Sequence, residues 1–163
     1  MLRLQTVRKE DHDLLYNINQ KYLYEMTNFY DDPMDENGNY GYGYFEDYFS
    51  NPKRKAFFLY NDQTLIGFAM ICPYSYINAH PDHVMAEFTV FPYFRRQGTG
   101  REAVRQLFAR YPGSWELKYN RKNTTAVKFW TAVTAPYRPR CRAYSPAEDV
   151  LVFRTDAGLE AAD

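Results

Sequence analysis

A turn with two arginines and two glycines joins a predicted strand to a predicted helix, and it constrains the fold more than any other segment of the chain. Residues 83–91 alternate between two faces, as in a β-strand. The turn Arg95-Arg96-Gln97-Gly98-Thr99-Gly100 follows, and the apolar residues of 98–110 then fall on one helical face. The N–H groups that begin a helix have no partner inside it and carry partial positive charge. The turn therefore predicts a site for an anionic group such as a pyrophosphate.

The remaining pattern predicts a mixed α+β fold, with a mostly antiparallel central sheet of about six to seven strands flanked by about four helices. A helix between two strands near the middle of the chain favours at least one parallel strand pair. We expect a single domain over residues 1–163, because this is an ordinary length for one domain. Strands are expected over 2–7, 56–60, 64–72, 83–91, 115–119, 137–144 and 149–154, and helices over 11–24, 44–50, 98–110 and 123–133.

Composition excludes several classes of protein. The chain has 20 basic and 20 acidic residues, so a polycation that coats nucleic acid is not expected, and we predict no nucleic-acid partner. The longest apolar run, 65–72, is too short to span a bilayer, and the first residues lack an apolar signal core. Cys72 and Cys141 form no CxxC pair, which predicts reduced thiols, a cytoplasmic location, no membrane association and no metal site.

Charge is balanced overall but not along the chain. Residues 10–50 contain ten acids and one base, whereas residues 92–146 contain twelve bases and two acids. The basic half suits phosphate groups and the acidic half suits a cation. Two solvated faces that attract each other are the structural alternative.

Two motifs in order resemble the GCN5-related N-acetyltransferase (GNAT) family. The first is Val90-Phe91-Pro92 followed by the glycine turn 95–100, and the second is Asn123-Thr124-Thr125-Ala126-Val127-Lys128-Phe129-Trp130. The spacing between the motifs and the order of elements also match, so the resemblance covers essentially residues 1–155.

The resemblance implies acetyl-CoA as the co-substrate, bound in a cleft where two neighbouring strands separate, with no metal. The backbone of Phe88, Thr89 and Val90 would pair with the pantetheine arm, and Asn123 would contact it from the second motif. The pyrophosphate would lie on the glycine turn, with Arg95, Arg96, Gln97, Gly98, Thr99 and Gly100 as its binding residues. An acceptor amine would attack the thioester directly, without an acyl-enzyme.

The attacking amine must be neutral, so a base is expected at the cleft. Glu87 is the candidate, with His83 as runner-up because strand alternation places both on one face; an ordinary strand residue is the alternative reading of Glu87. Many family members have a tyrosine as the second aromatic of the later motif, where it protonates the leaving thiolate. This chain has Trp130, whose indole N–H is not an acid at neutral pH. Tyr137 is the nearest substitute, and core packing is its alternative role.

Three functional hypotheses follow. The first is transfer of an acetyl group from acetyl-CoA to a primary amine of a small molecule or peptide. The second is a non-catalytic module of the same fold that senses acyl-CoA, and the third is a nucleic-acid adaptor that uses the basic stretch 92–146. Turnover separates the first two, and salt-dependent binding of nucleic acid tests the third.

The acidic segment predicts the charge of the acceptor. Residues 25–50 interleave carboxylates with aromatic rings, which together attract a cation, so we expect an acceptor with a positive charge beyond its reacting amine. Glycines at 38, 41 and 43 would let the segment close over it. A solvated loop is the alternative. The sequence identifies neither the acceptor nor the acyl length, and it leaves a homodimer open.

Overall fold

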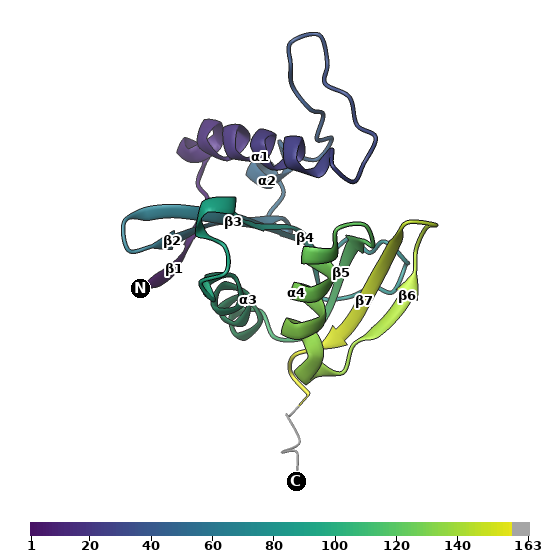
Figure 1. The fold of residues 1–163 in the computed structure, drawn as a ribbon. Helices are drawn as coiled ribbons and strands as arrows, with labels where there is room; N and C mark the ends of the chain where they lie inside the picture. Colours follow the sequence, from purple (N-terminus) through teal and green to yellow (C-terminus); the bar gives the residue numbers. More distant parts are fainter. Residues whose placement is uncertain (158–163) are drawn as a thin grey trace.

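The computed structural model describes residues 1–157, and a seven-stranded sheet organises them (Figure 1). The strand order is β1-β2-β3-β4-β5-β7-β6, and every neighbouring pair is antiparallel except β4 and β5. The strands are β1 (Leu2–Thr6), β2 (Lys55–Asn61), β3 (Thr64–Cys72), β4 (His83–Val90), β5 (Ser114–Asn120), β6 (Arg140–Ala143) and β7 (Glu148–Arg154), and the helices are α1 (His12–Met26), α2 (Asp47–Ser50), α3 (Thr99–Arg110) and α4 (Thr124–Thr134). The predicted mixed, mostly antiparallel fold with one parallel pair is confirmed.

Helices cover both faces of the sheet (Figure 1). The α1/α2 face, which α1 and α2 cover, has a core cluster of buried residues that includes Leu15, Ile18, Phe58, Phe68 and Met70. The α3/α4 face, on the other side, has a cluster that includes Val104, Leu107, Trp115, Leu117 and Trp130. Each face is therefore closed by apolar side chains from helices and strands together.

The first helix has a narrow buried stripe and no side-chain cap at its start. Leu14 is 39% exposed, whereas Leu15 and Ile18 are buried, so the buried stripe runs through Leu15 and Ile18 and omits Leu14. Asp11 makes no side-chain cap to the helix, because its carboxylate accepts from the backbone N–H of Arg8 at 2.9 Å. The preceding turn, and not the helix, thus uses this carboxylate.

The end of the chain differs as well. Tyr137 was expected to begin a strand, but it closes a short 3₁₀ helix, Ala135–Tyr137, and the strand is only Arg140–Ala143. Prolines at 136 and 139 have no N–H to donate to a sheet ladder, which explains the shorter strand.

A β-bulge in β4 reverses the alternation of its side chains. Met70 of β3 pairs with Glu87, whereas the next residue, Ile71, pairs with Met85, so Ala86 is the extra residue. Directly opposed residues share a face of the sheet. Ile71 and Met85 belong to the α3/α4 cluster and Met70 to the α1/α2 cluster, so Glu87 faces α1 and α2. The prediction that His83 and Glu87 share a face is wrong, because simple alternation does not allow for the bulge.

In the described part of the chain, no helix combines the length and the apolarity needed to cross a membrane.

Candidate active site

The parallel strands β4 and β5 separate part of the way along their length. Their pairing covers only His83–Met85 opposite Trp115–Leu117. Beyond these residues β4 stays paired with β3, and β5 stays paired with β7. The edge of β4 after Met85 therefore has backbone groups that no strand uses on the β5 side, and this opening is where a ligand can pair with the sheet.

Alternation of backbone groups decides which residues face the opening. The N–H of Phe91 donates to the carbonyl of Ile66 on β3 at 2.7 Å. Residues two apart point the same way, so Thr89 also directs its backbone to β3, while Phe88 and Val90 direct theirs to the opening. Pairing with the pantetheine arm stays a prediction for Phe88 and Val90, whereas the backbone of Thr89 is directed to β3 and away from the opening.

The glycine turn lies directly after β4. Arg96 and Gly98 both have left-handed backbones, with φ of 64° and 77°. Gly98 precedes the first residue of α3 and provides no side-chain cap, so the first N–H groups of the helix remain free for a ligand. A Cβ at Gly98 would meet no atom within 4 Å, so the space beside this backbone is open.

Gly100 is required for a different reason. Its Cβ would lie 3.3 Å from the ring of Phe129 and 3.4 Å from the side chain of Val90. The missing side chain thus lets α3 approach β4 and α4 closely. Arg96 and Gln97 are exposed at the turn, and the Thr99 hydroxyl lies 3.4 Å from the carbonyl of Phe94.

Arg95 does not contribute its charge to the turn. Its guanidinium donates to the Glu25 carboxylate at 2.7 Å and to the Val90 carbonyl at 2.6 Å. The prediction that Arg95 binds a pyrophosphate is therefore corrected: its Nε and Nη2 donors are used by the Val90 carbonyl and Glu25, and Arg95 ties the end of β4 to the end of α1. Glu25 lies 70 positions earlier, so no local pattern reveals the pair.

Glu87 lies on the α1/α2 face with tyrosines around it. Burial raises the pKa of its carboxyl to about 7, and this outweighs the hydroxyls of Tyr22 and Tyr42 and the ammonium of Lys118, which lower it. A carboxyl with this pKa exchanges a proton near neutral pH, as a general base requires.

His83 lies on the other face of the sheet. Its ring packs against Trp115 and Tyr111, with centroids 4.9 and 5.7 Å apart, and a ring nitrogen lies 3.2 Å from the carbonyl of Pro112. The bulge separates it from Glu87, so His83 is not placed to act as an alternative base.

A positively charged side chain that the sequence analysis did not single out lies beside the opening. Lys118 is the first residue of β5 beyond its pairing with β4. Its ammonium pairs with Glu148 of β7 at 2.8 Å and lies over the rings of Tyr76 and Tyr144, 4.8 and 5.0 Å from their centroids. Tyr30, between α1 and α2, donates its hydroxyl to the same carboxylate at 2.9 Å. The period-2 pattern of 115–119 could have placed Lys118 opposite the apolar face, but its partners are far apart in sequence.

The second motif forms the start of α4. Asn123 is the residue before the helix, and its side-chain oxygen accepts from the N–H of Ala126 at 3.1 Å. Trp130 is 7% exposed and packs with Phe88 and Phe129. The indole is therefore part of the α3/α4 core. The helix cap uses only the side-chain oxygen of Asn123 and leaves its amide nitrogen for other contacts.

Tyr137 is not placed at the opening. Its ring packs between Phe108 and Phe153, with centroids 5.6 and 5.9 Å away. Phe153 pairs with Trp115 at the paired end of β5, on the α3/α4 face. The predicted role of Tyr137 as general acid is corrected accordingly, because core packing holds the ring away from Glu87.

Most carboxylates of the acidic segment already have partners. Glu25 pairs with Arg95, Glu46 with His12 at 2.9 Å, and Asp35 accepts the backbone N–H groups of Asn37 and Asn39. Asp31, Asp32 and Glu36 are exposed in the long loop between α1 and α2, which projects from the body (Figure 1). The charge available to attract a cation is thus smaller than the sequence suggests.

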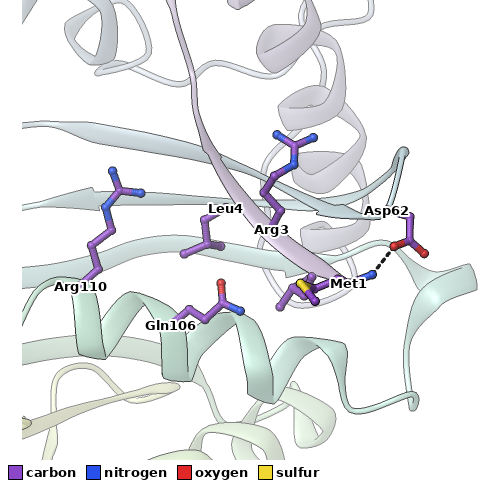
Figure 2. A pocket seen from close by; sticks show the side chains of 7 residues that line it. Met1, Arg3, Leu4, Asp62, Gln106 and Arg110 are labelled. Carbon is purple, nitrogen blue, oxygen red and sulfur yellow. Dashed lines mark hydrogen bonds and ion pairs between the residues drawn. The ribbon is translucent and has the colours of Figure 1, made fainter.

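A separate pocket lies between β1 and α3 (Figure 2). Its volume is about 530 Å³, and Arg3, Gln106 and Arg110 are among its lining residues. None of the predicted site residues lines it, so this pocket is not the opening between β4 and β5. In residues 1–157, no group of three or more His, Cys, Asp or Glu side chains could hold a metal ion.

Comparisons with known proteins agree with this architecture. Residues 14–133 match the model of the acetyltransferase (GNAT) family. No curated protein matches the sequence of the chain.

Solved structures with the same fold cover almost the whole chain. An acetyltransferase from Thermus thermophilus is 18% identical with a TM-score of 0.70, and the match covers 94% of this chain and 97% of that chain. The PaiA N-acetyltransferase of Thermoplasma acidophilum, solved in complex with coenzyme A, is 12% identical with a TM-score of 0.61 and coverage of 94% and 99%. The GNAT domain of S. lividans PAT is 12% identical with a TM-score of 0.69 and coverage of 94% and 90%. At these identities the likeness concerns the fold.

Proposed function

Because the chain belongs to the acetyltransferase (GNAT) family, we propose that it transfers an acetyl group from acetyl-CoA to a primary amine. The observation that carries the proposal is the opening between β4 and β5, with free strand groups on one side, the glycine turn at its end and Glu87 beside it. The coenzyme A complex of the Thermoplasma protein supports the choice of co-substrate. We further propose that residues 1–163 act as one domain, in the cytoplasm, where the free thiols Cys72 and Cys141 persist.

The geometry suggests how the co-substrate would bind. Phe88 and the N–H of Val90 would pair with the pantetheine arm, as an added strand would, and the amide nitrogen of Asn123 would contact it from α4. The pyrophosphate would lie at the start of α3, on the N–H groups that follow Gly98 and near the exposed side chain of Arg96.

Glu87 would act as the base. Its ionised carboxylate takes a proton from the acceptor ammonium, directly or through water, and the neutral amine then attacks the thioester carbon. The C–N bond forms, the attacking nitrogen then gives its second proton to water, the C–S bond breaks, and coenzyme A leaves as the thiolate. No covalent enzyme intermediate is needed.

The experiment that tests this function is an amine screen with acetyl-CoA, read by the release of free thiol. We expect turnover with at least one primary amine and mass spectrometry that shows the acetylated product. Acetyl-CoA binding without turnover across the panel would favour the second candidate, a non-catalytic acyl-CoA sensor. The burial of Trp130 and the packing of Tyr137 against the core are the observations that favour a sensor.

The acceptor is proposed to carry a second positive charge. Neutralising Asp31, Asp32 and Glu36 together, as D31N/D32N/E36Q, is expected to lower kcat/KM for the best amine several-fold at low salt. The loss should shrink as ionic strength rises, because exposed charges are screened beyond about 8–10 Å. Steady-state rates at two salt concentrations measure it.

The control for this experiment is E10Q/D13N/D62N, which removes the same charge outside the acidic segment. Asp35 is left intact because it holds the backbone of its own turn. Equal losses in both triple variants, or best activity with a neutral or anionic amine, would contradict the cationic acceptor.

A further inference from the structure

Lys118 occupies the point where the two parallel strands separate. Leu117 is the last residue of β5 that pairs with β4, and Lys118 follows it. Trp115, Leu117 and Tyr119 belong to the α3/α4 core, so strand alternation places Lys118 on the α1/α2 face, the same face as Glu87. A carboxylate on β4 and an ammonium on β5 therefore flank the opening.

Side chains from four segments of the chain surround the ammonium of Lys118. The carboxylate of Glu148 on β7 pairs with the ammonium at 2.8 Å. The ammonium also lies over the rings of Tyr76 and Tyr144, 4.8 and 5.0 Å from their centroids. The hydroxyl of Tyr30 donates a 2.9 Å hydrogen bond to the Glu148 carboxylate and so holds it in position. The Lys118 side chain is 24% exposed, and Glu148 uses one of its three N–H donors. The ammonium is therefore paired with one carboxylate and remains partly exposed.

Glu148 and two neighbouring phenols set the charges around Lys118. Although burial acts to raise it, hydrogen bonds from Lys118 and Tyr30 hold the pKa of Glu148 below its ordinary value. Burial raises the pKa values of Tyr30 and Tyr76 above their ordinary range, so these phenols stay neutral. Near neutral pH, Glu87 is the group facing this site whose own charge changes.

A positive charge near the sulfur would assist acetyl transfer. As the C–S bond breaks, its electron pair goes to sulfur, and negative charge appears where none existed in the thioester. A fixed charge aimed at that place stabilises the transition state without having to reorganise. Neither Trp130 nor Tyr137 provides one, because neither is cationic: Trp130 lies in the α3/α4 core and Tyr137 packs against it.

We propose that Lys118 is a catalytic residue that stabilises the leaving thiolate of coenzyme A as an ion pair; the inference rests on the proposed acetyl transfer. Glu87 takes a proton from the acceptor ammonium, and Lys118 acts through its positive charge without transferring a proton. The thiolate takes its proton from solvent after release.

Equilibrium binding tests the ion pair apart from activity. An opposite charge within about 4–6 Å lowers a pKa by about 1–3 units, so bound coenzyme A should ionise at lower pH than the free thiol. Its affinity, measured by calorimetry, should therefore rise about 10-fold between pH 7 and pH 9.5. Desulfo-coenzyme A lacks the thiol and should show no such rise, which corrects for the titration of Glu87.

Two substitutions at Lys118 distinguish a charge from a structural role. K118R keeps the positive charge and should retain most of the pH-dependent gain, whereas K118Q should lose it while binding desulfo-coenzyme A as wild type does. If K118Q fails to fold because Glu148 is left unpaired, the K118Q/E148Q variant removes both charges and should also lose the gain.

Each outcome separates this inference from the proposed function. Coenzyme A that binds with the same pH dependence in wild type and K118Q would overturn the role of Lys118 and leave acetyl transfer standing. If neither coenzyme A nor its desulfo analogue binds wild type, the proposed function fails, and the inference fails with it.

Discussion

Replacing Glu87 by glutamine is expected to lower kcat by at least about 100-fold while leaving the affinity for acetyl-CoA nearly unchanged. Glutamine keeps the shape of the side chain, and it cannot take a proton from the acceptor. The effect is expected on kcat because Glu87 would act on the acceptor amine and is not part of the glycine turn. Initial rates and calorimetry on the same protein preparation measure the two quantities.

The pH profile gives the expected sign. The base acts in its ionised form, and burial raises its pKa to about 7, so kcat/KM of wild type should rise as pH increases through about 7. E87Q should lose this rise, whereas E10Q, which changes an exposed residue of the first turn, should keep it. An unchanged rate in E87Q would leave water as the base.

Stability offers an independent check on Glu87. Its folded-state pKa lies above the ordinary value of 4.5, so the folded protein binds this proton more tightly than the unfolded chain does. The contribution of Glu87 to stability is therefore present at low pH and declines as pH rises from about 4.5 through about 7. Chemical unfolding should show E87Q gaining stability relative to wild type over that interval.

Replacing Gly98 by glutamate is expected to weaken acetyl-CoA binding by roughly 10- to 150-fold, since a lost charge-assisted contact costs about 1.5–3 kcal/mol. The new side chain would enter the open space beside the turn and bring a negative charge towards the pyrophosphate. The left-handed φ of 77° adds strain for any side chain. Calorimetry of acetyl-CoA and of coenzyme A measures the loss.

The control separates backbone strain from charge. Asparagine tolerates the left-handed backbone better than other side chains, so G98N tests occupation of the space without a negative charge. Affinity should fall less in G98N than in G98E. If G98E, folded by its thermal transition, binds acetyl-CoA as tightly as wild type, the turn is not the pyrophosphate site.

Periodicity in the sequence was enough to predict the element order. Leu107 and Phe108 of α3 are buried at their predicted helical spacing, and Trp115 and Leu117 of β5 are buried at spacing two. These patterns are local, because one face of each element must contact the core wherever that core lies. The left-handed backbone at Gly98 and the start of α4 at Asn123 are local for the same reason.

Pairing across the sheet was not predictable in this way. The bulge at Ala86 exists only relative to Met70 and Ile71 on the neighbouring strand, and it moves Glu87 to the face opposite His83. Arg95 pairs with Glu25, which lies 70 positions earlier in the chain. A side chain predicted to bind a ligand therefore links two parts of the protein instead. Single-strand alternation contains no information about either.

The sequence by itself determined the class of fold, the family and the place of the glycine turn, because short-range spacing and backbone preference specify them. Only the tertiary structure decided which charges surround the opening between β4 and β5. Lys118 and Glu148 come from adjacent antiparallel strands, and Glu87 comes from a strand that leaves β5 after Leu117. The interaction between two charges depends on their distance in space and not on their separation along the sequence. Strand register sets that distance, and register is a property of the assembled sheet.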